Sequence, residues 1–188
     1  MKVILASASP RRQELITRLF EEYSVVPADI DETIPDEIGA EFAPVFLAAQ
    51  KAQAIAEMHP EALIIAADTI VIADGEILGK PKDRNEAKKM LRFLSGKTHK
   101  VITGCCIRKG TESESFHEES YVTFFELSEN EISDYVDKGL ADGKAGAYGI
   151  QDNGALFVQK IEGDYYNIVG LPIARLNREI QQFLEEEK

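Results

Sequence analysis

A short segment near the start of the chain carries hydroxyl and guanidinium groups where a helix is expected to begin. The apolar run Val3–Ala6 is followed by Ser-Ala-Ser-Pro-Arg-Arg. Cations at a helix N-terminus oppose the macrodipole at a cost of roughly 0.3–1 kcal/mol, so this arrangement favours a bound anion such as phosphate. A plain helix start, with a serine cap and a proline at the first position, fits the same residues. The groups concerned are those of Ser7, Ser9, Arg11 and Arg12.

A carboxylate follows an apolar run in the middle of the chain. Leu63–Ala67 is a predicted buried strand, and Asp68 and Thr69 come directly after it. Ligands bind at strand ends in α/β sheets, so Asp68 is a candidate for binding a metal and activating a water molecule. The alternative is that Asp68 caps a turn, although the residues after Thr69 continue as a strand.

Three more carboxylates, those of Asp29, Asp31 and Glu32, follow the second predicted strand. Oxygen ligands of this kind suit Mg²⁺ or Mn²⁺, which bind through one or two carboxylates and substrate phosphates. In a chain this acidic, the same cluster also fits a solvated loop.

Two lysines are candidates for binding a polyphosphate. Lys51 lies on a predicted helix after a run of small residues, and Lys80 lies between a glycine and a proline that would hold it on a rigid turn. Each taken alone also fits a surface lysine. Together with Arg11 and Arg12 they would gather four cations around one anion.

The loop Lys144–Gln151 is rich in small residues and would let a flat ring approach the backbone closely. The amide of Gln151 could donate to and accept from the edge of a nucleobase. An ordinary glycine-rich turn is the alternative, and Gly170–Pro172 could likewise either line a cleft or simply start a helix.

Alternating helical and strand-like patterns predict an α/β protein with a mixed sheet. Asp83 is expected to cap the third helix, Ser128 with Glu131 to form a capping box on the fourth, and Asp74-Gly75 and Gly163-Asp164 to form hairpin turns. The predicted helices are Pro10 to about Phe20, Phe42–Met58, Arg84–Leu94, Ser128–Lys138 and Pro172–Glu186. The predicted strands are Lys2–Ala6, Ser24–Pro27, Leu63–Ala67, Ile70–Ala73, Val101–Arg108, Ser115–Glu126, Ala155–Ile161 and Tyr165–Val169.

The composition of the chain argues against several classes of function. With 188 residues, 44% of them hydrophobic, the chain can bury one core without disulfide or metal staples. Its net charge of −12 argues against binding a nucleic acid polymer, and no stretch approaches the roughly 20 apolar residues that span a membrane. The three histidines lack the spacing of a zinc site. Adjacent Cys105 and Cys106 suit buried thiols in a reducing compartment, so we expect a cytoplasmic protein.

Several of these motifs occur together and in order over essentially the whole chain, which resembles the Maf family of nucleoside triphosphate pyrophosphatases, also described as septum-formation inhibitors. The motifs are Ser7–Arg12, Asp31-Glu32, Lys51-Ala52, Ala67–Thr69, Gly79–Pro81, Leu94–Gly96 and Lys144–Gln151.

The resemblance implies one Maf-like domain over residues 1–188, with two lobes around a deep nucleotide-binding cleft and an elongated mixed sheet flanked by helices. It also implies metal-dependent cleavage between the α- and β-phosphates, and many members are homodimers. Asp68 matches the catalytic carboxylate, Glu32 a metal or water-positioning partner, and Lys80 a catalytic cation. The residues expected around the substrate are Ser7, Ser9, Arg11, Arg12, Lys51, Thr69 and Gln151.

At three positions the chain resembles the subgroup of the family that acts on dTTP and UTP. These positions are Arg11 directly after Pro10, Thr69 after Asp68, and Gln151 at the end of the loop that begins at Lys144. Modified pyrimidine nucleotides are further candidate substrates. Two other functions share these features. A regulator of septum formation would bind nucleotide without cleaving it, and a nucleotidyltransferase would need an acceptor.

Overall fold

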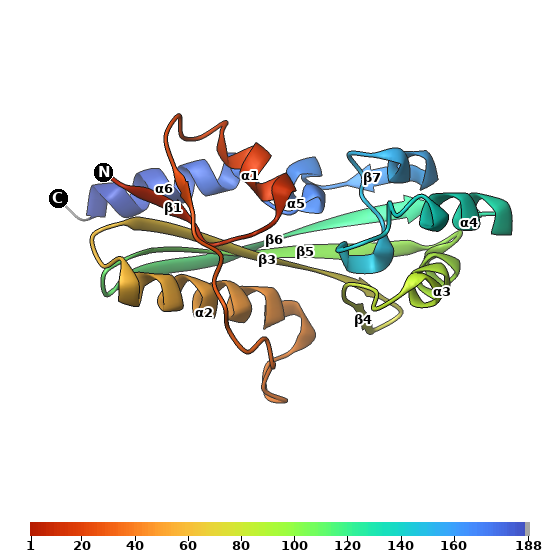
Figure 1. The fold of residues 1–188 in the computed structure, drawn as a ribbon, viewed down its shortest axis with the longest axis horizontal. Coiled ribbons are helices and arrows are strands. Elements are labelled where there is room, and N and C mark those ends of the chain that lie inside the picture. Colours follow the sequence, from red (N-terminus) through yellow and green to blue (C-terminus); the bar gives the residue numbers. More distant parts are fainter. Residues whose placement is uncertain (187–188) are drawn as a thin grey trace. The chain divides into compact units, whose positions relative to one another are not determined.

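The structure is a computed structural model that describes residues 1–186 (Figure 1). Contacts between Cα atoms divide the chain into two compact units, and each is described by itself. The first unit comprises Met1–Asp68, Thr103–Glu118 and Gly170–Lys188, and the second comprises Thr69–Ile102 and Glu119–Val169.

Within residues 1–186, seven strands form one sheet, and its mixed character is as the sequence predicts, although Glu76–Leu78 was not among the predicted strands. They are β1 (Val3–Leu5), β2 (Ser24–Val25), β3 (Leu63–Ala73), β4 (Glu76–Leu78), β5 (Thr98–Lys109), β6 (Glu112–Phe124) and β7 (Val158–Glu162). The order is β2-β1-β3-β5-β6-β7, with β4 paired to β3. β1 is parallel to β2 and β3, whereas β4 and β7 are antiparallel to their partners.

Nine helical segments accompany these strands in the described part of the chain. They are α1 (Pro10–Ile16), η1 (Ala40–Phe42), α2 (Ala43–Met58), α3 (Arg84–Leu94), α4 (Glu129–Asp137), η2 (Ala145–Ala147), η3 (Asn153–Phe157), α5 (Tyr165–Val169) and α6 (Ile173–Glu186). No helix in residues 1–186 has the length and apolar content that crossing a bilayer requires.

The core of the first unit forms where α2 packs against β1 and β3. Ile4 and Ile64 are paired in register and fully buried. Ala48, Ala52 and Ile55 of α2 pack against them. Because alanine side chains are small, the helix lies close to the sheet and brings its neighbouring residues near the ends of the strands. Figure 1 shows α2 on one face of these strands and α1 and α6 on the other.

A glycine on β5 permits an equally close approach by the start of α2. A Cβ atom on Gly104 would lie 2.3 Å from the Pro44 carbonyl carbon and 2.3 Å from the Val45 nitrogen. Distances this short do not occur for real Cβ atoms, so any larger residue would push the helix away from the strand. Gly104 therefore fixes where α2 begins relative to the sheet.

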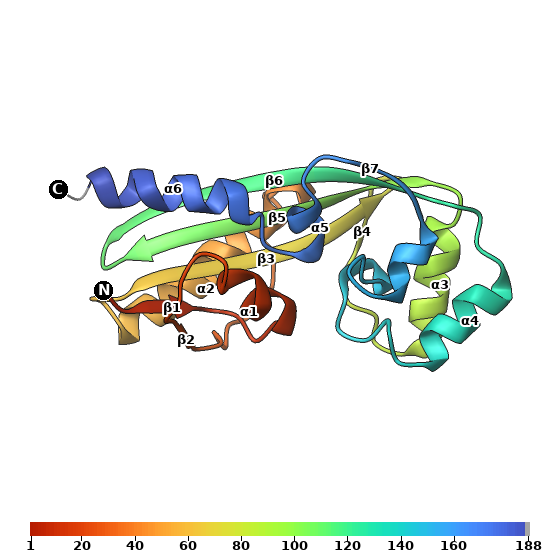
Figure 2. The ribbon, with the colours of Figure 1, turned by 90° about the horizontal axis from the view of Figure 1, so that it is seen from above.

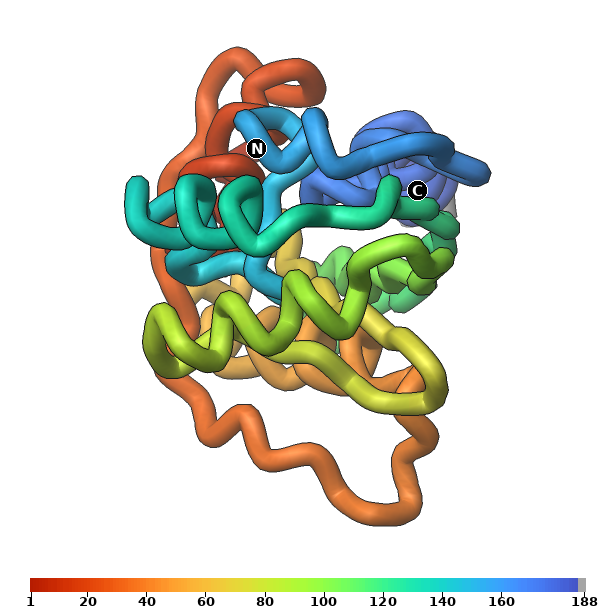
Figure 3. Tube along the Cα trace, turned by 90° about the vertical axis from the view of Figure 1, so that its right-hand side faces the viewer, coloured from red at the N-terminus to blue at the C-terminus, as the bar shows by residue number. Residues whose placement is uncertain are grey.

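In the second unit, β3 and β4 form a hairpin whose turn is Asp74-Gly75, as predicted. Both turn residues have positive φ, 49° and 82°, which matches the turn type that two-residue hairpins favour. The helices α3 and α4 lie side by side (Figure 2 and Figure 3). The Arg92 guanidinium joins them through two hydrogen bonds of 2.7 Å to the Glu129 carboxylate.

The predicted caps of α3 and α4 are confirmed. The Asp83 side chain accepts a hydrogen bond of 2.8 Å from the Glu86 N–H. Ser128 and Glu131 form the reciprocal capping box, with the Ser128 hydroxyl accepting from the Glu131 N–H. These interactions satisfy N–H groups that the helices cannot satisfy internally.

The prediction of a strand over Tyr165–Val169 is wrong, because this segment is helix α5. Gly163-Asp164 is accordingly not a hairpin turn. The Asp164 carboxylate accepts a hydrogen bond of 2.8 Å from the Tyr166 N–H, which starts the helix. The Asn167 amide is fully buried and donates to oxygens of β5 and β6. These contacts outweigh the strand preference of the tyrosines and β-branched residues.

Other differences concern boundaries. Helix α1 ends at Ile16 rather than near Phe20, and Ala155 lies in η3 rather than in a strand. The two strands predicted on either side of Asp68 are one continuous strand, β3. Asp68 therefore does not cap a turn, and its carboxylate projects from an extended strand.

The cysteines are buried and unpaired, as predicted. Burial raises the pKa of Cys105 to about 12, which keeps its thiol protonated at neutral pH. Both residues therefore act as small core side chains.

Candidate active site

Three charged side chains meet in the first unit. Lys51 Nζ on α2 lies 2.7 Å from Asp68 Oδ1 on β3 and 2.7 Å from Glu32 Oε1 on the loop after β2. The side chains of Lys51 and Asp68 are only 11% and 16% exposed, whereas that of Glu32 is 50% exposed. The structure therefore brings together three of the predicted site residues from distant parts of the sequence.

The position of Lys51 follows from the small residues around it. Ala48 and Ala52, on the same helix, face the sheet and are fully buried. Lys51 lies beside them, so its aliphatic stem is buried and its ammonium reaches the oxygens at the polar end of the apolar run in β3. The local sequence thus places one cation beside the candidate catalytic carboxylate.

Arg12 is held by two oxygens of the same unit. Its Nε donates to the Gly170 carbonyl oxygen at 2.8 Å, and its Nη1 donates to Ser7 Oγ at 3.3 Å. Burial lowers the pKa of Arg12 below its usual value, and the negative charges of Asp68 and Glu32 oppose that shift. Because a guanidinium remains protonated in proteins, Arg12 contributes a fixed positive charge to the cluster.

The serines of the first motif have unequal roles. Ser7 is buried, and its Oγ accepts hydrogen bonds from the Ser9 N–H at 3.2 Å and from Arg12. Ser9 precedes α1 with Pro10 at the first helical turn, but its side chain makes no capping hydrogen bond. Arg11 is half-buried on α1, whose first turn carries no acidic residue. Ser7 rather than a serine cap therefore orders this corner.

The acidic residues after β2 were predicted to form either a metal site or a solvated loop, and the structure shows a different role for each residue. Asp31 Oδ1 accepts from both the N–H and the hydroxyl of Thr33, at 2.9 and 2.6 Å, which is a local loop interaction. This interaction lowers the pKa of Asp31. Glu32 instead reaches Lys51, and Asp29 is exposed. Only Glu32 of the three has a contact that suits the site.

The remaining predicted residues, Thr69, Lys80 and Gln151, belong to the second unit. There the Gly146 N–H donates to the Gly79 carbonyl oxygen at 3.1 Å, which joins the segment of Lys80 to the glycine-rich loop. Lys80 and Gln151 are exposed. Gly146 has φ of 67°, and a Cβ there would lie 3.0 Å from Val71, so the loop requires glycine at this point.

Sequence reasoning missed the side chains that hold this loop. The Tyr135 hydroxyl accepts from the Gly149 N–H at 3.0 Å and lies 3.0 Å from Asp152 Oδ1. The other carboxylate oxygen of Asp152 pairs with Lys144 Nζ at 3.3 Å. Asp152 Oδ1 also accepts from the Gly154 N–H, a local turn pattern that could have marked it in the sequence.

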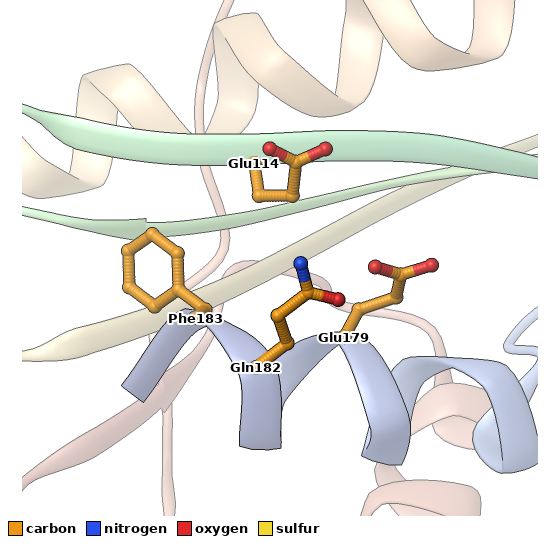
Figure 4. A pocket seen from close by; sticks show the side chains of 4 residues that line it. All are labelled: Glu114, Glu179, Gln182 and Phe183. Atoms are coloured by element: carbon orange, nitrogen blue, oxygen red, sulfur yellow. The ribbon is translucent and has the colours of Figure 1, made fainter. Parts of the chain in front are cut away.

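A small pocket in the first unit has none of these residues in its lining. Its lining includes two carboxylates, and its volume is about 150 Å³, below the roughly 300 Å³ of ordinary ligand pockets. It contains no cation that could bind phosphate. The side chains, drawn in Figure 4, are Glu114, Glu179, Gln182 and Phe183.

Comparison with known proteins decides the family. The family model described as Maf-like protein matches residues 2–183. The chain belongs to the Maf family. It is 52% identical over 186 residues to a dTTP/UTP pyrophosphatase of Bacillus cytotoxicus, covering 97% of this chain and 95% of the relative. It is 50% identical over 182 residues to a protein of the same name from Bacillus mycoides, with the same coverage.

A solved structure gives a more distant likeness to this Maf chain. The Ham1 protein of Staphylococcus aureus matches with a TM-score of 0.45 and 18% identity, covering 66% of this chain and 72% of that one.

The donor set of this Maf chain fits one kind of metal ion. Residues 1–186 contain no group of three or more histidine, cysteine, aspartate or glutamate side chains that could enclose a metal. Glu32 and Asp68 supply two carboxylates close enough to share one ammonium. Mg²⁺ and Mn²⁺ take oxygen ligands and are bound through one or two carboxylates together with substrate phosphates. The two carboxylates therefore suit a cation that also has phosphate ligands.

One residue outside the predicted site also contributes to it. Gly170 binds Arg12 through its carbonyl oxygen, and its φ of 121° is a conformation that L side chains rarely adopt. The sequence pattern had left Gly170–Pro172 open between lining a cleft and starting a helix. The helix start is confirmed, because α6 begins directly after Pro172.

Proposed function

We propose that this protein hydrolyses dTTP and UTP between the α- and β-phosphates, releasing the nucleoside monophosphate and pyrophosphate. The observation that carries the proposal is the partly buried cluster in which Lys51 pairs with Asp68 and Glu32, with the charge of Arg12 close enough to interact with both carboxylates. Relatives about half identical over 97% of this chain bear the name dTTP/UTP pyrophosphatase, which supports the choice of substrates. Modified pyrimidine nucleoside triphosphates belong to the same proposal.

In the proposed reaction, the oxygen atom of a water molecule forms the new bond to phosphorus. Asp68 accepts a proton from the water molecule as the water oxygen bonds to the α-phosphorus, and the P–O bond between the α-phosphorus and the bridging oxygen breaks. Pyrophosphate then leaves with the electron pair of that bond. Arg12 and Lys51 offset the negative charge that develops on the phosphates, and Arg12, which is held by two protein oxygens, does so without reorganising.

Glu32 and Asp68 are the residues that would hold Mg²⁺ or Mn²⁺, and the cation would supply further neutralisation of phosphate charge. Ser7 positions Arg12 through its hydroxyl. Ser9, Arg11, Thr69 and Gln151 stay predicted substrate contacts, and Lys80 stays a predicted catalytic cation. Of these, Gln151 suits the edge of a pyrimidine and Lys80 a phosphate.

The substitution Asp68→Asn tests the proposal. It keeps the size of the side chain but cannot accept the proton, so turnover of dTTP and UTP should fall by about 10²–10⁴-fold with the fold retained. Asp74→Asn is the matched control, because Asp74 lies in an exposed hairpin turn and should not affect turnover. Monophosphate and pyrophosphate are measured by chromatography.

Two outcomes would contradict the proposal. Unchanged turnover in Asp68→Asn would remove Asp68 from proton transfer. Nucleotide binding by the wild-type protein without release of pyrophosphate would favour a non-catalytic regulator, and formation of a new phosphoester with an added acceptor would favour a nucleotidyltransferase.

We further propose a cytoplasmic protein that is a homodimer. The buried, unpaired thiols fit a reducing compartment, and the dimer is an expectation from family resemblance. Light scattering coupled to size-exclusion chromatography gives the oligomeric state.

A further inference from the structure

Lys51 occupies the position between the two carboxylates that are the candidate metal ligands. Its ammonium lies 2.7 Å from an oxygen of each, and its side chain is 11% exposed. A lysine at this position is more than a contact for substrate, because it already neutralises the oxygens that a divalent cation would need.

The charges of the cluster balance without any metal. Lys51 and Arg12 contribute two positive charges, and Asp68 and Glu32 contribute two negative ones. A divalent cation entering this cluster alone would have to displace the ammonium from both carboxylates while remaining close to two positive side chains. Such repulsion is strong where water screens poorly, as it does beside the largely buried Asp68.

A nucleoside triphosphate changes this balance. Its phosphate oxygens bring several negative charges, and a lysine ammonium on a flexible stem has three donors that it can turn from one acceptor to another. When Lys51 turns to a phosphate, carboxylate oxygens of Asp68 and Glu32 become available to a cation. The added negative charge also offsets the repulsion from Arg12.

We propose that Lys51 is an exchangeable counter-ion, which holds Asp68 and Glu32 until the nucleotide arrives and thereby makes divalent cation binding depend on nucleotide binding. This inference rests on the proposed function for the identity of the anion. Because such coupling is reciprocal, the cation and the nucleotide each raise the affinity for the other. Couplings of this kind are typically about 5- to 150-fold.

The test is binding of Mn²⁺ alone, measured by electron paramagnetic resonance on the nucleotide-free protein. The wild type should bind Mn²⁺ weakly, in the millimolar range. Lys51→Met keeps the length of the side chain and removes its charge, so its Mn²⁺ affinity should rise by about tenfold or more. Adding Asp68→Asn to Lys51→Met should abolish that gain.

Lys97→Met is the matched control. Lys97 also pairs with a carboxylate, Asp74 Oδ2 at 2.7 Å, but on the surface of the second unit. The substitution Lys97→Met removes the same charge from the protein as Lys51→Met. If net charge alone governed Mn²⁺ affinity, both variants would show the same gain, and that result would overturn the proposal.

Two other results would also overturn it. One is equal Mn²⁺ affinity in the wild type and in folded Lys51→Met, with folding checked by circular dichroism. The other needs no variant and therefore holds even if Lys51→Met does not fold: micromolar binding of Mn²⁺ to the nucleotide-free wild type. Since neither measurement involves turnover, failure of the counter-ion role and failure of the proposed hydrolysis are seen separately.

Discussion

The pH dependence of stability should report on one buried histidine, His99 of β5. The residue is 1% exposed, and its Nε2 lies 2.8 Å from the Tyr148 hydroxyl. Its Nδ1 has no hydrogen-bond partner among the described residues. The rings of Phe124 and Tyr148 pack edge-on against the imidazole. Burial lowers the pKa of His99 from 6.5 to about 4, because the charged imidazolium would lose its hydration there.

The sign of the effect follows from this lowered pKa. Between pH values of about 6.5 and about 4, the unfolded chain binds a proton at this histidine and the folded chain does not. The stability from keeping His99 neutral is therefore fully present above its ordinary pKa and is lost as the pH falls toward about 4. Between about pH 7.5 and about pH 5, this one residue should lower the free energy of unfolding by about 2 kcal/mol.

Urea unfolding at these two pH values measures the effect. In His99→Gln, an amide that does not titrate replaces the imidazole and can still bond to the Tyr148 hydroxyl. The loss of stability on acidification should therefore be about 2 kcal/mol smaller in this variant than in the wild type. His59→Gln is the control, because it removes a histidine at the end of α2 but leaves His99 in place, so the contribution of His99 should remain in this variant.

Equal losses in the wild type and in His99→Gln would refute this reasoning. A proton NMR titration of the wild-type protein checks the same point without a substitution. The His99 imidazole should remain neutral at about pH 5, and a signal that titrates near its ordinary pKa would also refute it.

Two glycines give further predictions. Gly104→Ala should lower the free energy of unfolding by about 3 kcal/mol or more in urea, because the new Cβ meets the backbone of α2 at 2.3 Å. Gly79→Ala, whose Cβ would meet nothing within 4 Å, is the stability control. Gly170→Ala should lower kcat/KM for dTTP by about tenfold, since a residue at φ of 121° is strained and its carbonyl holds Arg12.

Each of these predictions has a result that would contradict it. Equal stability of the Gly104 and Gly79 variants would mean that α2 can shift at no cost. An unchanged kcat/KM in folded Gly170→Ala would mean that the carbonyl does not position the guanidinium.

The elements that could be predicted are those whose signals are local. Asp83 and Glu86 lie three residues apart and make the cap of α3 without help from the rest of the chain. The same holds for the capping box of α4 and for the turn Asp74-Gly75. In each case the residues that form the cap or turn lie within four residues of one another, so a short stretch of sequence contains the whole interaction.

Helix α5 shows where such reasoning fails. Its five residues favour a strand when taken by themselves, and what decides the conformation is distant in sequence. The buried Asn167 amide donates to the Val101 carbonyl oxygen and to Ser120 Oγ, 66 and 47 residues away. A buried amide without partners would be costly, so these contacts select the helix. No local pattern could have indicated them.

In the candidate site, some features could be predicted from the sequence and others depend on contacts between distant residues. The chemistry of Asp68, Glu32 and Lys51 could be assigned from residue types and from the family motifs, but their mutual contact could not. That contact depends on how closely α2 approaches the sheet, which is set by Ala48 and Ala52 on the helix and by Gly104 on β5. A larger residue at any of these positions would move Lys51 away from the carboxylates. The glycine and the alanines thus place the Lys51 ammonium beside the two carboxylates. They therefore also underlie the dependence of metal binding on nucleotide binding that we propose.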